Sequence, residues 1–133
     1  MLRHVVAAMF VIVGVIHLLP LSGVLGGERL AVLYGVSFSD PNLVILMRHR
    51  AVLFGLLGLF LFFAAFRRSM QPAAFIVSFV SVLSFLCLAW SVGSYNAQIG
   101  RVFAADIVAL ACLLIAVAAY AYGARRDIRE GPR

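Results

Sequence analysis

The sequence contains no lysine and few acidic residues, so arginine carries almost all of its charge. All 11 basic residues are arginine, against 5 aspartates and glutamates, which gives a net charge of +6. A basic excess can indicate nucleic-acid binding, but these arginines flank apolar segments and form no continuous stripe. We therefore expect no nucleic-acid partner and interpret the arginines as determinants of membrane topology.

Paired cysteines and the common catalytic motifs are also missing. Cys87 and Cys112 lie in separate apolar runs without CxxC spacing, which favours a packing role over a disulfide or a metal site. No HExxH, GxGxxG or Walker sequence occurs, and no Ser-His-Asp arrangement can be proposed. We therefore name no catalytic residue and no metal ligand, which favours a non-enzymatic protein over an enzyme.

Apolar residues dominate what is there. They make up 65% of the 133 residues, against roughly 45–50% in soluble domains. A chain of this length cannot bury so much apolar surface in a core of its own, because small domains leave much of their surface exposed. The composition predicts a single domain, residues 1–133, that is solvated by lipid.

Four apolar runs have the length of membrane spans. They cover about residues 4–22, 41–66, 72–94 and 102–123, each close to the ~20 residues that a spanning helix needs. Helices satisfy their own backbone groups in lipid, and the runs are too long for strands. Asp40 before Pro41 is typical of a helix start, with an N-cap and proline at the first position. The sequence predicts an all-α, integral membrane four-helix bundle.

The connections add detail to this bundle. The third span follows the second after only residues 67–71, so these two spans should be antiparallel neighbours. We expect them to pack through small residues on facing sides: Ala51, Gly55 and Gly58 of the second span, and Ser78, Ser81, Ser84 and Cys87 of the third. Within residues 22–39, the stretch GGERLAVLYGV predicts a short helix in the membrane interface. Residues 124–133 form a basic tail.

The arginines predict an orientation with both termini inside. Arginine is enriched in cytoplasmic segments of membrane proteins. One side would hold Arg3, Arg67, Arg68, Arg125, Arg126, Arg129 and Arg133, and the other only Arg29, Arg48, Arg50 and Arg101. We therefore expect an N-in, C-in protein with a cytoplasmic tail.

Polar residues inside the spans gather in one leaflet. Under this topology seven side chains fall near the outer face: His17, Arg48, His49, Arg50, Asn96, Arg101 and Asp106. Charges in lipid are costly and usually paired, so we predict an ion pair between Asp106 and Arg48 or Arg50. The cluster acts either as a structural clamp or as a binding site. His17 and His49 at similar depth would also allow axial ligation of a haem.

The stretches GVIHLLPLSG, YGVSFSDPNLVILMRHRAVLFGLLG and RVFAADIVAL resemble the small four-helix bacterial membrane proteins called DoxX-like. This resemblance implies a multi-pass protein of the bacterial inner membrane. Similar chains sometimes carry the name phosphopantetheine adenylyltransferase, a soluble α/β enzyme with an HxGH-type motif. Val-Val-Ala follows His4 and Leu-Leu-Pro follows His17, so the sequence does not support that activity.

Three classes of function are compatible with these features. The first is a non-enzymatic accessory or interaction subunit, whose partners are the lipid bilayer and another membrane protein or a second copy of itself. The second is a binder or carrier of a small amphipathic ligand, a quinone or a lipid, at the polar cluster. A haem-binding redox protein is a third. An outer pocket lined by the cluster would favour binding, and a cluster consumed by its own hydrogen bonds would favour the subunit.

Overall fold

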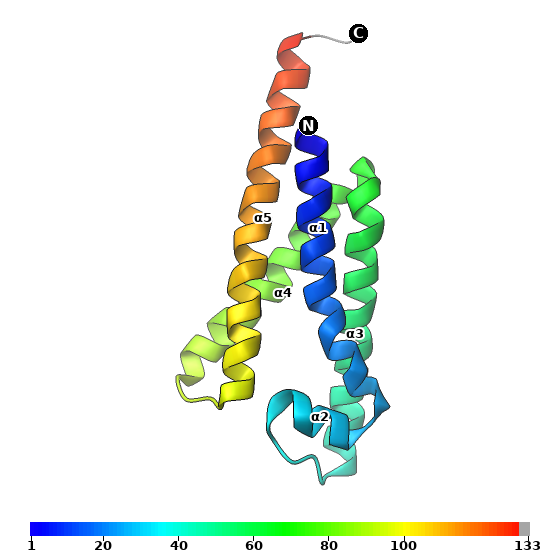
Figure 1. Cartoon of the computed structure of the whole chain (residues 1–133), viewed down its shortest axis with the longest axis vertical. Coiled ribbons are helices and arrows are strands. Elements are labelled where there is room, and N and C mark those ends of the chain that lie inside the picture. Colours follow the sequence, from blue (N-terminus) through cyan, green and yellow to red (C-terminus); the bar gives the residue numbers. More distant parts are fainter. Residues whose placement is uncertain (131–133) are drawn as a thin grey trace.

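The computed structural model describes residues 1–130, apart from the side chains of Asp127 and Glu130, and this range is helical throughout with short connections (Figure 1). Its elements are α1 (Leu2–Leu18), the 3-10 helix η1 (Leu19–Leu25), α2 (Gly27–Tyr34), α3 (Pro41–Phe66), the 3-10 helix η2 (Arg68–Met70), α4 (Gln71–Val92) and α5 (Ala97–Glu130). Four segments are long and apolar enough to cross a membrane: Leu2–Leu25, Pro41–Phe66, Arg68–Val92 and Ala97–Arg126. The predicted all-α fold is confirmed, and so is the number of helices that are long and apolar enough to cross a membrane.

Local chemistry explains where the helices begin and end. The Asp40 carboxylate accepts a hydrogen bond of 2.8 Å from the backbone N–H of Asn42, and Pro41 takes the first position of α3, as predicted. α1 stops at Leu18 because Pro20 has no N–H for an α-helical bond, and the chain continues as the 3-10 helix η1. α4 ends at Gly93, whose φ of 73° closes the helix in the left-handed region.

α5 is longer than the predicted fourth span at both ends. It begins at Ala97 rather than near residue 102, because the Asn96 side chain caps it by accepting a 2.9 Å hydrogen bond from the Ile99 N–H. It then continues for 34 residues to Glu130, through most of the predicted basic tail. At about 1.5 Å per residue it is roughly 50 Å long, more than the ~30 Å hydrocarbon core. Its arginine-rich end therefore extends beyond the apolar part of the bundle, and residues 131–133 of that tail lie outside the described range.

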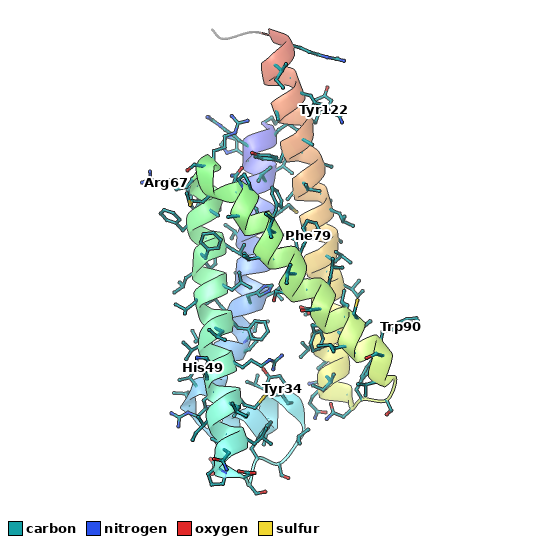
Figure 2. The ribbon with its side chains drawn as sticks, turned by 180° about the vertical axis from the view of Figure 1, so that it is seen from behind. Tyr34, His49, Arg67, Phe79, Trp90 and Tyr122 are labelled. Atoms are coloured by element: carbon teal, nitrogen blue, oxygen red, sulfur yellow. The ribbon has the colours of Figure 1, made fainter. Side chains whose placement is uncertain are left out.

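α1 lies between α3 and α5 and packs against both. The N-terminus and the last turns of α5 lie at one end of the bundle, here called the termini end, and α2 lies across the other, the α2 end (Figure 1). α4 crosses obliquely, from beside α3 at the termini end to beside α5 at the α2 end (Figures 1 and 2). The buried core fills the space between these helices, with Phe10 of α1 against Phe75 of α4 at a ring-centroid distance of 4.7 Å.

The small residues of α3 face α1 and η1, whereas we predicted that they would face α4. A Cβ atom on Gly58 would lie 2.9 Å from the carbonyl oxygen of Gly14 in α1, and one on Gly55 would lie 2.6 Å from Leu21 in η1. Contact between two helix backbones is closest where both helices carry glycine. Residues 71–92 contain no glycine, so α4 cannot compete with α1 for this face of α3.

The small residues of α4 do not contact the glycine face of α3. The Ser78 hydroxyl is buried and donates to the Ala74 carbonyl of its own helix at 2.6 Å. Ser84 and Cys87 are exposed, so the expected packing role fails for Cys87 and holds for Cys112, which is buried in the core. α4 therefore packs through a mixture of small and large buried side chains, among them Ala74, Phe75, Ser78, Val82, Leu86 and Ala89.

Replacing Gly58 by alanine should destabilise the bundle, because its Cβ atom would meet the Gly14 backbone, which cannot move aside without shifting α1. Gly100→Ala in α5 is the matched control, since a Cβ atom there meets nothing closer than 3.7 Å. Both changes carry the same gain in helix propensity, so their difference measures the clash, which we expect to cost about 1–3 kcal/mol. The measurement is the thermal unfolding midpoint of each variant in detergent. Equal midpoints would show that the α1–α3 contact tolerates a methyl group.

Candidate functional site

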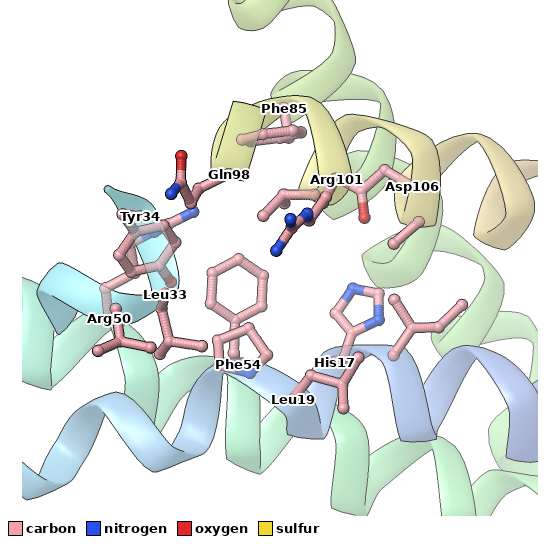
Figure 3. A pocket seen from close by; sticks show the side chains of 15 residues that line it. His17, Leu19, Leu33, Tyr34, Arg50, Phe54, Phe85, Gln98, Arg101 and Asp106 are labelled. Carbon is pink, nitrogen blue, oxygen red and sulfur yellow. The ribbon is translucent and has the colours of Figure 1, made fainter. Parts of the chain in front are cut away.

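A cavity of about 270 Å³ lies at the α2 end, between α1, α2, α3, α4 and α5 (Figure 3). Its polar lining side chains are His17, Tyr34, Arg50, Gln98, Arg101 and Asp106. Apolar side chains form the rest of the wall, among them Leu33, Phe54 and Phe85. Ligand sites in proteins typically combine an apolar wall with a few convergent polar groups in this way.

Arg50 extends from α3 into this cavity and is covered by two aromatic rings. Its guanidinium carbon lies 4.8 Å from the centroid of the Phe54 ring and 5.4 Å from that of Tyr34. Phe54 is one turn further along α3, and Tyr34 comes from α2, so Arg50 joins the two elements. Cation–π contacts of this kind stabilise a partly buried guanidinium and leave its N–H donors in the plane of the group available.

Asp106 and Arg101 come from α5 on the other side of the cavity. Asp106 is half-buried, and the charge that acts on its carboxylate is that of Arg50. Within the described residues, however, no direct ion pair joins Asp106 to Arg48 or Arg50, so the predicted contact is wrong. The reason is geometric: α3 and α5 stand apart at the α2 end, and the cavity separates their side chains. The two charges attract one another through space.

His17 is buried, with 3% of its surface exposed, and both of its ring nitrogens have partners. Its Nδ1–H donates to the Val13 carbonyl at 2.9 Å, which leaves Nε2 to accept from the Ser81 hydroxyl at 3.2 Å. The second bond connects α1 to α4 at the base of the cavity. His17 thus borders the cavity with its ring, while its hydrogen-bonding capacity serves the bundle.

Arg48 and His49 do not line the cavity. Three consecutive helical residues are about 100° apart around the axis, so an inward Arg50 turns the other two outward. The Arg48 Nε–H donates to the Val24 carbonyl of η1 at 2.7 Å, and His49 is exposed on the outside of α3 (Figure 2). Since His17 and His49 do not face one common cavity, their geometry does not fit axial ligation of a haem.

Asn96 connects the end of α2 to the start of α5. While its side-chain oxygen caps α5, its Nδ2 donates to the carbonyl oxygens of Tyr34 at 2.8 Å and Gly35 at 3.3 Å, at the end of α2. The C-terminal end of α2 is thereby fixed to the start of α5. Asn96 was predicted as a site residue, and the structure gives it a positioning role at the cavity's edge.

The apolar wall of the cavity was missed in the sequence, and so were Tyr34, Phe54 and Gln98, which lie beside its charged side chains. Phe54 follows Arg50 by four residues, a spacing that places both on one helix face, and this signal could have found it. Tyr34 belongs to the stretch GGERLAVLYGV that was predicted as a short helix, but it was not predicted as part of the site. Gln98 carried no signal, because its place depends on where α5 begins.

No group of three or more His, Cys, Asp or Glu side chains in the described part of the chain could hold a metal ion. Comparison of the chain with protein-family models, with curated proteins and with solved structures gave no match. The resemblance to DoxX-like proteins therefore stays a prediction, and the function has to be argued from the cavity itself.

Asn96 provides a test of how α2 is held, because two substitutions separate its two roles. Asn96→Asp keeps the oxygen that caps α5 and loses the donor to Tyr34, whereas Asn96→Ala loses both. Losing a hydrogen bond worth about 1 kcal/mol should raise amide exchange in residues 27–35 about fivefold in both variants. Exchange at the start of α5 should rise only in Asn96→Ala. Hydrogen exchange followed by mass spectrometry measures both segments, and unchanged exchange in α2 would contradict the role of Asn96 as a tether.

Proposed function

We propose that this multi-pass membrane protein binds a small amphipathic molecule, a quinone or a lipid, in the cavity at its α2 end. The observation that carries the proposal is the lining: an apolar wall with Phe54 and Phe85, and three charged side chains, Arg50, Arg101 and Asp106, from two different helices. An amphipathic molecule can satisfy both kinds of surface at once, and it reaches such a site from the bilayer.

The state of the charged side chains supports binding over a purely structural clamp. In the described residues, Arg50, Arg101 and Asp106 make no hydrogen bond or ion pair within the protein, whereas His17, Arg48 and Asn96 all do. In a structural clamp, these charged side chains would form ion pairs or hydrogen bonds with one another. The role of accessory or interaction subunit, which the sequence favoured, stays a prediction without a specific observation in its support.

The proposal contains no catalytic step and no resident haem. Its grounds are geometric, since His49 lies on the outside of α3 and His17 already has a partner at each nitrogen. We further propose that the protein resides in a bacterial inner membrane with both termini in the cytoplasm and α2 lying in the outer interface. The distribution of arginines supports this orientation, because Arg125, Arg126 and Arg129 lie at the termini end.

The orientation is tested with one cysteine on each side of the membrane. Ser94 follows α4 at the α2 end and Ser69 lies in η2 at the termini end, and both are exposed. In a Cys87→Ser background, a membrane-impermeant maleimide should label Ser94→Cys in intact cells and Ser69→Cys only after lysis. The remaining Cys112 is buried. The reverse pattern would overturn the N-in, C-in orientation and leave the cavity proposal standing.

Binding is tested by native mass spectrometry of the purified protein with three probes: decylubiquinone, laurate and monolaurin. We expect at least one probe to be retained at one molecule per chain. Arg50→Gln should weaken its retention about tenfold, because a hydrogen bond to a charged group is lost. His49→Gln is the matched control, since His49 is the neighbouring residue but lies outside the cavity. If no probe is retained in an Arg50-dependent way, the proposal is wrong.

A further inference from the structure

A second hollow adjoins the cavity on the flank of the bundle. It has a volume of about 260 Å³ and is lined by Arg50, Leu53, Phe54, Leu57 and Ser81. α3 and α4 lie together at the termini end and diverge toward the α2 end, so the hollow forms where their separation begins (Figure 2). We call it the α3–α4 groove. Since 51% of the surface of Leu53 is exposed on a membrane-spanning helix, the rim of the groove faces lipid.

The groove and the cavity are continuous at two shared residues. Arg50 and Phe54 line both of them. Beyond Arg50, the groove offers mainly leucine and phenylalanine side chains, while the cavity offers Arg101, Gln98 and Asp106. Each volume lies just below the roughly 300–1,000 Å³ typical of ligand sites. Together they match a molecule with one hydrocarbon chain and a compact polar head, rather than a phospholipid with two chains.

The charge of the cavity selects among such molecules. Arg50 and Arg101 are cations at any physiological pH, so the lining is net positive in either protonation state of Asp106. Neither guanidinium has a hydrogen-bond acceptor within the described residues, although Arg50 has its two aromatic contacts. A guanidinium binds a carboxylate or phosphate through paired, charge-assisted hydrogen bonds that are about twice as strong as neutral ones. A neutral quinone or alcohol head group would gain less.

We propose that the ligand is a single-chain amphiphile with an anionic head group, which enters from the membrane through the α3–α4 groove. The head group lies between Arg50 and Arg101, and the chain lies in the groove along Leu53 and Leu57. This inference rests on the proposed function, and it specifies the ligand class and the route of entry. A carboxylate and a phosphate head group share the required chemistry.

The head-group preference is tested with a matched pair of probes that share one chain. Laurate and monolaurin each carry a twelve-carbon acyl chain, but only laurate is anionic; dodecyl phosphate provides the phosphate head group. In native mass spectrometry titrations, both anions should bind at least about tenfold more tightly than monolaurin. Arg50→Gln should abolish this preference, while His49→Gln should preserve it. A difference between the two anions identifies which head group the site favours.

The outcomes separate this inference from the proposed function. Equal binding of laurate and monolaurin, or a preference for decylubiquinone, would overturn the anionic ligand class and leave a binding protein. Failure of all four probes would overturn both proposals. If Arg50→Gln does not fold, Arg101→Gln provides the same comparison, since Arg101 also lines the cavity and is otherwise exposed.

The position of the hydrocarbon chain in the α3–α4 groove is tested with two tryptophan substitutions on α3. Leu53 lines the groove and is 51% exposed, whereas Leu59 is 58% exposed and lines neither hollow. Both positions face lipid to a similar extent, so either substitution should leave the fold intact. Leu53→Trp should weaken laurate binding several-fold by filling the groove, and Leu59→Trp should leave it unchanged. Unchanged laurate binding in both variants would overturn the groove as the site of the chain.

Discussion

The backbone contact between Gly14 of α1 and Gly58 of α3 is the constraint on which the rest of the arrangement depends. It brings α1 close to α3 and uses the small-residue face that α4 would otherwise need. α4 has no glycine with which to form an equivalent contact, and it lies obliquely, nearer to α5 at the α2 end (Figure 2). The separation of α3 from α5 at that end follows, and the cavity occupies it. The cavity thus exists because α1 and α3 pack closely while α3 and α5 are separated at the α2 end.

A second constraint comes from the backbone at the α2 end. The last carbonyl groups of a helix have no partner within that helix, and those at the ends of η1 and α2 accept hydrogen bonds from side chains. Arg48 donates to Val24 and Asn96 donates to Tyr34, and both bonds hold the segment that covers the cavity. Two residues expected in the functional cluster therefore have a positioning role. Within the predicted cluster, Arg50, Arg101 and Asp106 line the cavity, whereas Arg48 and Asn96 hold the segments around it.

The sequence predicted the four apolar helices and the start of α3 well, but it predicted the start of α5 and the packing faces poorly. Span lengths and the Asp40-Pro41 cap depend on local chemistry, which a single sequence contains. In a soluble protein, the inward face of a helix is recognised because it is more apolar than the face toward water. Lipid is as apolar as a protein core, so this difference is lost in a membrane span. The face of α3 was therefore assigned to the wrong neighbour. Arg48, His49 and Arg50 were all placed in the predicted cluster, and only the positions of α1 and α2 show that Arg50 is the one that lines the cavity.

The energetic cost of Arg50 in a membrane is partly offset by contacts that leave its N–H donors unused. An arginine in the hydrocarbon region costs at least about 2.5–3.5 kcal/mol unless it reaches water or a partner. The rings of Tyr34 and Phe54 offset part of this cost for Arg50, and the through-space attraction of Asp106 offsets another part. Neither uses the guanidinium N–H groups, and a direct Asp106 contact would have used several of them. These free donors beside an apolar groove are the basis of our proposal that the site binds an acceptor from outside the protein rather than acting as a clamp.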